Sequence, residues 1–367
     1  MLTRRSVIGT LGAILFDVGF TPPAFAKDLS AVLQSAMAGT STPALGCLIV
    51  RNGRVAEIAA VGLRRIGRPE HVQPGDRWLT GSCGKPMTTT LIARLVDRGA
   101  LSWNTPLSRM LPELAPSMLA DYRTVTLLQI LSHRAGFSRG DELVGDQWFS
   151  DPRPLPQQRL DFMMQALKQA PVSAPGTAAH YSNTGFIAAA AIAERITNVP
   201  YEELMRREVF GPLGMASAVF RQPESGELSG HRDGRPAKPI DSGPGIYNSD
   251  GLILITLQDW AKFCIDQLAG AKGEGVLLSR ASYRLMQSPL PGSEDALTWG
   301  FDASLGGRKG PVLSHTGTDE NWYASVNLFL NSGDGIILTA SAGKSMGGQA
   351  ADEAAFKSLL PTISTPV

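Results

Sequence analysis

Strand-forming segments stand at both ends of this chain, and helix-forming segments lie between them. Near the start, residues 45–50 and 55–61 are mostly apolar and flank Asn52-Gly53, a dipeptide that favours a tight hairpin turn. Near the end, three apolar segments predict the strands of an antiparallel meander: 312–315, 322–330 and 335–341. The simplest assembly pairs the hairpin with the meander in one antiparallel sheet.

The region between these strands has the spacing of amphipathic helices. The clearest predicted helix follows Ser82, because Met87, Leu91 and Leu95 fall on one face of it. The other candidate helices are 29–37, 125–131, 160–167, 186–196, 201–209, 257–268 and 349–360, and 221–245 is predicted to be a long loop. This pattern predicts an α+β fold, in which an antiparallel sheet flanked by helices joins a mostly helical second lobe. A substrate cleft is expected between the lobes.

The 367 residues are predicted to comprise a targeting segment, 1–26, and one domain, 27–367. Within the domain, the α/β lobe takes about 27–104 and 249–367, and the helical lobe takes about 105–248.

Residues 1–26 have the pattern of a bacterial export signal. Arg4-Arg5 precedes a short apolar stretch, and Ala24-Phe25-Ala26 has the small residues of a cleavage site. The paired arginines favour the twin-arginine route. An uncleaved membrane anchor is the alternative, but the apolar stretch is shorter than the ~20 residues of a spanning helix. We therefore predict a periplasmic or secreted protein with no membrane span after removal of the signal.

Charge and cysteine content exclude several classes of protein. Lys plus Arg number 34 and Asp plus Glu number 33. Such a balanced chain lacks the electrostatic footprint of a protein that binds nucleic acid or anionic membranes. Cys47, Cys83 and Cys264 are too few for a disulfide framework and match no zinc spacing, so we predict buried apolar side chains. We expect no metal and no organic cofactor.

Ser82-Cys83-Gly84-Lys85 is the first candidate for chemistry. One helical turn separates the serine and the lysine, so their side chains can touch. A serine hydroxyl becomes a good nucleophile when a neighbouring base takes its proton. The tetrapeptide alone is a weak signal, because Ser341-Ala342-Gly343-Lys344 repeats the Ser-x-x-Lys spacing after a predicted strand. The helix that follows Ser82 favours the first copy.

Tyr181-Ser182-Asn183 is a second candidate, in a loop before a predicted helix. A phenol can relay a proton to a leaving group, and an amide can bind a substrate carbonyl. In the alternative interpretation, Tyr181 is a core aromatic residue and Asn183 is a helix cap.

His315-Thr316-Gly317 is the third candidate, at the end of a predicted strand. A small residue there lets a substrate lie along the strand edge. The alternative is a half-buried strand histidine. A Ser-His-Asp enzyme is the weaker chemical hypothesis, because Gly-x-Ser-x-Gly is absent and the other four histidines show no triad spacing.

The order of these three elements resembles that of the serine β-lactamase-related family. That family includes class C β-lactamases, D-alanyl-D-alanine carboxypeptidases, D-aminopeptidases and some esterases. Residues 130–136 are similar to its "LLSHxSG" segment. Asp250-Gly251-Leu252, with Thr256 and Asp259-Trp260, is similar to its "GGL-ST-DLA" segment. Together the matches cover most of residues 40–345.

The resemblance implies chemical roles for four residues. Ser82 would attack the substrate carbonyl and form an acyl-enzyme, while Lys85 and Tyr181 would share the base and acid work. The backbone N–H groups of Ser82 and Thr318 would form the oxyanion hole. Water would then release the acyl group.

The resemblance also implies substrate contacts. Asn183 would contact the substrate amide or the lysine, and His315, Thr316 and Gly317 would face the substrate along the strand edge. β-Lactamases typically carry lysine where this chain has His315. A neutral imidazole binds a carboxylate less well than an ammonium does, so we favour an esterase or a D-peptidase over a β-lactamase.

Two acidic residues, Asp319 and Glu320, directly follow Thr318. They could repel an anionic substrate or hold a cationic amine, but solvated loop residues are the favoured interpretation. Cys83 adjoins the nucleophile, and no role is assigned to it.

The sequence therefore predicts a serine hydrolase that acts on a small ester, a D-amino-acid peptide or a β-lactam. The alternative is a penicillin-recognising binding or sensor module with little or no turnover. A weaker third hypothesis is a fold retained for protein interaction. The natural substrate and the oligomeric state stay open.

Overall fold

The computed structural model describes residues 26–363, so the predicted export signal, apart from its last residue, lies outside the described part of the chain. No helix among those residues is long and apolar enough to cross a membrane.

The centre of the fold is a six-stranded sheet with the strand order β2-β1-β10-β9-β8-β7, in which all neighbours are antiparallel. Its strands are β1 (Ala44–Arg51), β2 (Arg54–Gly62), β7 (Gly300–Leu305), β8 (Arg308–Thr318), β9 (Tyr323–Phe329) and β10 (Asp334–Ala340). Leu45 of β1 lies opposite Ala340 of β10. The predicted pairing of the two ends of the chain is therefore confirmed.

Strand β7 was not predicted from the sequence. Its residues read Gly-Phe-Asp-Ala-Ser-Leu, and Asp302, Ala303 and Ser304 are exposed. Since β7 is an edge strand and buries little apolar surface, its sequence lacks the apolar segment that identified the other strands of the sheet.

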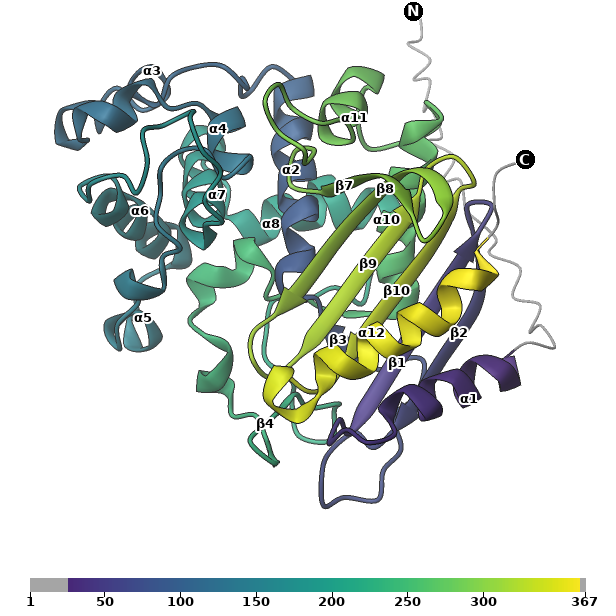
Figure 1. The fold of residues 1–367 in the computed structure, drawn as a ribbon. Coiled ribbons are helices and arrows are strands. Elements are labelled where there is room, and N and C mark those ends of the chain that lie inside the picture. Colours follow the sequence, from purple (N-terminus) through teal and green to yellow (C-terminus); the bar gives the residue numbers. More distant parts are fainter. Residues whose placement is uncertain (1–25, 364–367) are drawn as a thin grey trace, which may run out of the picture.

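Helices cover both faces of this sheet (Figure 1). Helices α1 (Ala26–Met37) and α12 (Gly348–Leu359) lie across one face, where Ala351, Ala355 and Leu359 are buried as predicted. The other face packs against α2 (Lys85–Asp97) and α10 (Leu257–Ala271), with α11 (Arg280–Met286) beside α10. Alternate residues of the strands therefore enter two different apolar cores.

Residues 105–248 are mostly helical and stand to one side of the sheet (Figure 1). The helices are α3 (Leu107–Met110), α4 (Leu127–Leu131), α5 (Gln147–Ser150), α6 (Leu155–Ala166), α7 (Asn183–Thr197), α8 (Tyr201–Met205) and α9 (Gly211–Leu213). Short helical turns connect them at Ala115–Ser117, Ala120–Thr124, Asp141–Leu143 and Arg206–Phe210. The helix predicted at 125–131 begins at Leu127, because Thr126 and Gln129 form a capping box. The division into lobes stays a prediction, since one apolar core runs through both regions.

The segment 221–245 is less irregular than predicted. It contains a small hairpin of β4 (His231–Arg232) and β5 (Arg235–Pro236), followed by the turn η6 (Pro239–Ser242). The turn η7 (Gly245–Asp250) then leads into β6 (Leu254–Thr256), which pairs with β3 (Arg77–Leu79). This second small sheet positions η1 (Gly81–Gly84), the turn that carries Ser82.

Candidate active site

Ser82 and Lys85 are in direct contact. Ser82 lies in the 3₁₀ turn η1 and Lys85 is the first residue of α2, so the α-helix begins after the serine rather than on it. The Nζ atom of Lys85 donates to Ser82 Oγ over 3.0 Å and to the backbone oxygen of Asp250 over 2.9 Å. Lys85 is fully buried and forms no ion pair within residues 26–363. An amine held against a hydroxyl in this way can accept its proton.

Close backbone packing joins the turn η1 to the end of β8. A Cβ atom added to Gly317 would lie 2.5 Å from the amide nitrogen of Ser82, and one added to Gly81 would lie 2.7 Å from that of Thr318. Such separations exclude a side chain at either position. The N–H groups of Ser82 and Thr318 therefore belong to two backbone segments in contact, as the two donors of an oxyanion hole must.

Tyr181 lies beside the lysine. Its ring centroid is 5.1 Å from Lys85 Nζ, and its side chain is 40% exposed, so it is not a core aromatic residue. The ring stacks on His133 with 4.6 Å between centroids. The contact with Lys85 is made by the face of the ring.

His133 is a site residue that the motif analysis missed, although it lies in the family-like segment 130–136. The amide of Ser182 donates to its Nδ1 over 3.0 Å. Burial, followed by the charge of Lys85, lowers the pKa of His133 to about 3. His133 is therefore a neutral aromatic ring that stacks on the Tyr181 ring. The sequence signal that could have identified it was the family-like segment 130–136, not the spacing between histidines.

The strand edge after Ser314 faces the nucleophile. β7 pairs with β8 only as far as Ser314, so residues 315–318 have one paired neighbour, β9. His315 is half-buried, and burial with the charge of Lys85 lowers its pKa to about 4. Thr316 is exposed. The edge therefore presents a neutral imidazole and a hydroxyl near neutral pH.

Asn183 is the first residue of α7, and the helix cap is its neighbour Ser182, whose Oγ accepts from Gly185 over 3.2 Å. The amide nitrogen of Asn183 donates to the backbone oxygen of Arg139 over 3.0 Å. Its Oδ1 atom is buried and has no hydrogen-bond partner in the described part of the chain. The structure thus places Asn183 at the border of the site, where it forms no hydrogen bond with Lys85.

The two acidic residues after Thr318 differ from each other. Asp319 turns inward, where its Oδ1 accepts from the amides of Asn321 and Trp322, each over 3.0 Å. Burial raises the pKa of this carboxyl. Asp319 therefore builds the β8–β9 loop rather than being solvated, whereas Glu320 is exposed as predicted.

The cysteines are free and buried, as predicted. Cys83 points away from the nucleophile, and its thiol donates to the backbone oxygen of His315 over 3.4 Å. Across residues 26–363, no cluster of three or more His, Cys, Asp or Glu side chains could hold a metal ion.

The second Ser-x-x-Lys copy does not form a site. Ser341 is fully buried and its Oγ donates to the backbone oxygen of Ala44 over 3.5 Å, whereas Lys344 is exposed. The two side chains therefore lie in different environments.

A cavity of about 290 Å³ lies along the strand edge beside Tyr181. Asp295 is the one charged side chain among the residues that line it. These residues are Ser132, His133, Ala179, Tyr181, Ser293, Asp295, Ala296, Thr298, Trp299, Gly300, Ser314, His315 and Thr316. The cavity is about the size of a small-molecule site.

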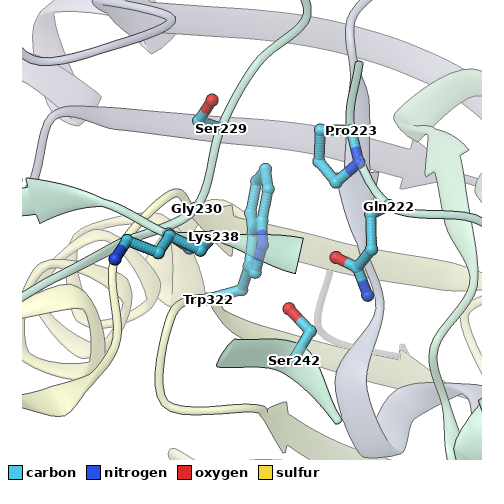
Figure 2. A pocket seen from close by; sticks show the side chains of 8 residues that line it. Gln222, Pro223, Ser229, Gly230, Lys238, Ser242 and Trp322 are labelled. Atoms are coloured by element: carbon cyan, nitrogen blue, oxygen red, sulfur yellow. The ribbon is translucent and has the colours of Figure 1, made fainter. Parts of the chain in front are cut away.

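Figure 2 shows a second hollow, in which the Trp322 ring lies between Pro223 and Lys238. Its volume is about 30 Å³, room for little more than one water molecule. Neither Ser82 nor Lys85 is among the residues that line it.

The chain is similar to known proteins in sequence and in fold. A family model described as "Beta-lactamase" matches residues 29–359. "Penicillin-binding protein 4" of Amycolatopsis lactamdurans is 27% identical over 327 residues, which are 82% of this chain and 81% of that protein. "Esterase EstB" of Burkholderia gladioli is 32% identical over 244 residues, 61% of each chain. The solved D-amino acid amidase of Ochrobactrum anthropi SV3 has a TM-score of 0.72 at 19% identity and covers 92% of this chain and 98% of its own.

Proposed function

This chain belongs to the β-lactamase family of serine hydrolases, and we propose that Ser82 is its nucleophile and that the reaction passes through an acyl-enzyme. The observation that carries the proposal is the 3.0 Å hydrogen bond from the buried Lys85 Nζ to Ser82 Oγ. The predicted resemblance to this family is confirmed by the match over residues 29–359.

In the first half of the proposed reaction, Ser82 Oγ attacks the substrate carbonyl and its proton passes to the amine of Lys85. Negative charge develops on the carbonyl oxygen. The N–H groups of Ser82 and Thr318 would donate to that oxygen, and one such donor typically contributes about 10²–10³ in rate. The tight packing of Gly81 and Gly317 supports this role, because it fixes both donors before the substrate arrives.

In the second half, the leaving group takes a proton and departs, and water then attacks the acyl-enzyme. Tyr181 is the proposed proton donor, because its ring lies beside Lys85 and the residue is 40% exposed, so that the phenol could recover a proton from the lysine. Stacking on His133 holds the ring in place. The same two groups would deprotonate the water in deacylation.

The proposed substrates are small esters and amides of D-amino acids rather than β-lactams. The pKa of about 4 leaves His315 neutral near pH 7, so the strand edge offers no cation to a β-lactam carboxylate. The esterase and the D-amino acid amidase among the similar proteins support this choice. We further propose that residues 1–26 direct the enzyme to the periplasm or beyond.

Labelling tests the proposal. A fluorescent fluorophosphonate should attach to the wild-type protein and to Ser341→Ala, but not to Ser82→Ala. Equal labelling of all three proteins would refute the role of Ser82. Steady release of product from an ester or a D-alanyl amide would identify an enzyme. A stable adduct with a fluorescent penicillin and no turnover of any substrate would instead favour a binding or sensor module.

A further inference from the structure

Three successive backbone carbonyls, those of residues 249–251, face the segment that carries the nucleophile. They lie at the end of η7 and directly after it. The first oxygen accepts from Thr88 Oγ1 over 2.7 Å. The middle oxygen accepts from Lys85 Nζ over 2.9 Å, and the last accepts from Thr80 Oγ1 over 2.9 Å. The amine of the proposed base is therefore the middle one of three side-chain donors, with a threonine on each side.

The three donors come from both sides of the nucleophile and are fully buried. Thr80 directly precedes η1, whereas Lys85 and Thr88 lie one turn apart on α2 and share a face of that helix. The two backbone segments also touch, because a Cβ atom on Gly251 would lie 1.7 Å from the Gly81 oxygen. The carbonyls are thus held against the nucleophile segment by side chains and by backbone packing.

A buried tyrosine fixes the direction of the Thr88 hydroxyl. Tyr201, the first residue of α8, places its hydroxyl 2.7 Å from Thr88 Oγ1. A threonine hydroxyl has one proton, and here that proton goes to the Ser249 oxygen, because a carbonyl can only accept. Tyr201 must therefore be the donor in its contact with Thr88. The hydrogen bonds thus run in one direction, from α8 through α2 to the first of the three carbonyls.

We propose that Thr80 and Thr88 are positioning residues for the Lys85 amine, which fix the Asp250 carbonyl by bonding the carbonyls on either side of it. Apart from Ser82 Oγ, that oxygen is the only hydrogen-bond partner of Lys85 Nζ in the described part of the chain. A neutral amine that acts as a base has two N–H groups and one lone pair. An N–H held on the Asp250 oxygen limits rotation of the amine and directs the lone pair toward Ser82. This inference rests on the proposed function, since it takes Lys85 as the base.

The second-order rate of Ser82 labelling by a fluorophosphonate tests the proposal. Thr90 offers a matched control, because it is fully buried on the same helix but its Oγ1 donates to the Pro86 oxygen over 2.9 Å, within α2. Thr88→Val should lower the rate by about 10- to 100-fold, the cost of a misplaced reacting group. Thr90→Val should change it by less than about twofold, and Thr88→Ser, which keeps the hydroxyl, by less than about threefold. A wild-type rate in Thr88→Val, or equal losses in Thr88→Val and Thr90→Val, would overturn the inference.

A double variant separates positioning of the amine from support of the fold. Lys85→Ala leaves no amine to position, so Thr88→Val added to it should lower the remaining labelling rate by less than about twofold. A further loss as large as that in the wild-type background would overturn the inference.

Thr80→Val replaces Thr88→Val in both comparisons if the latter does not fold. The Gly251 oxygen also accepts from the Ile253 amide over 2.7 Å, so this carbonyl keeps a partner and the expected fall is smaller, about threefold to tenfold. If the wild-type protein is labelled at Ser82 but the threonine variants react equally fast, only this inference fails. If the wild-type protein is not labelled, the proposed function fails and this inference fails with it.

Discussion

The chain contains the Ser-x-x-Lys spacing twice, and the two copies lie in different environments. In the copy at 82–85, the lysine is buried and donates to the serine over 3.0 Å. In the copy at 341–344, the serine is buried against Ala44 and the lysine is exposed. The shared Ser-x-x-Lys spacing is therefore not enough to make a site.

Backbone packing around the motif makes the difference. Gly317 and Gly251 bring two distant segments onto the backbone at Ser82. Gly343, in the second copy, instead packs against the backbone oxygen of Glu320, from which an added Cβ atom would lie 1.9 Å. The first copy thus lies among groups that can bind a substrate, and the second supports the loop after β8.

Removing each lysine should separate the two copies most strongly. Lys85→Ala deletes the base that contacts Ser82, so kcat/KM for an ester should fall by about 10³-fold or more. Lys344→Ala removes an exposed side chain and should change kcat/KM by less than about twofold. Steady-state hydrolysis of a p-nitrophenyl ester measures both. Comparable losses in the two variants would contradict the assignment.

Replacing Gly317 or Gly343 by alanine should give the next largest difference in activity between the two copies. Gly317→Ala pushes a Cβ atom against the Ser82 amide, so kcat should fall by about 10²–10³, the value of one oxyanion donor. Gly343→Ala should mainly reduce the free energy of unfolding, by about 1–3 kcal/mol for overpacking. Urea unfolding and single-turnover kinetics distinguish the two effects. A fully active Gly317→Ala enzyme would exclude the proposed oxyanion hole.

A positive charge at position 315, beside the first copy, should have a moderate effect on the rate of acylation by a penicillin. With a pKa of about 4, His315 becomes an imidazolium only when the pH falls toward 4, so wild-type acylation by a carboxylate-bearing penicillin should gain nothing from this group between pH 7 and 5.5. His315→Lys should increase that acylation about tenfold at pH 7, through one hydrogen bond to a charged group. The second-order rate of labelling by fluorescent penicillin tests this. A wild-type rate that rises as the pH falls from 7 to 5.5 would mean that His315 titrates normally.

The smallest expected effect belongs to Ser341→Ala. The Ala44 oxygen also accepts from the Ser341 amide over 3.0 Å, so loss of the hydroxyl leaves that acceptor satisfied. The free energy of unfolding should fall by no more than about 1 kcal/mol, and hydrolysis should be unaffected. Thermal unfolding detects such a change. Loss of activity here would show that the second copy contributes to catalysis.

The sequence predicted those parts of this molecule that depend on local patterns. Alternating or continuously apolar segments identified β1, β2, β8, β9 and β10, and helical spacing identified α2, α7, α10 and α12. The edge strand β7 was missed because it buries little apolar surface. The 3₁₀ turn that contains Ser82 was missed because the spacing of apolar residues does not fix the residue at which a helix begins. The pairing of the chain ends followed from the need to assemble separate strands in one sheet.

The site was predicted less completely. Ser82, Lys85 and Tyr181 were named from their order along the chain, and the structure brings them together. His133 was not singled out as a separate residue, because its stacking on Tyr181 is visible only in three dimensions. Asp319 was placed in solvent because nothing in the sequence shows that a loop carboxylate turns back onto its own amides.

The adjacency of β1 and β10 also determines when this enzyme can become active. Leu45 and Ala340 meet across the sheet although most of the chain separates them. Ser82 and Lys85 leave the ribosome long before the β8 edge is synthesised. Contacts of such long range also form slowly, because a large loop must close first. A nascent or truncated chain that ends before β8 would therefore carry the nucleophile without the partners that make it reactive, and hydrolysis would begin only after β8 has been synthesised.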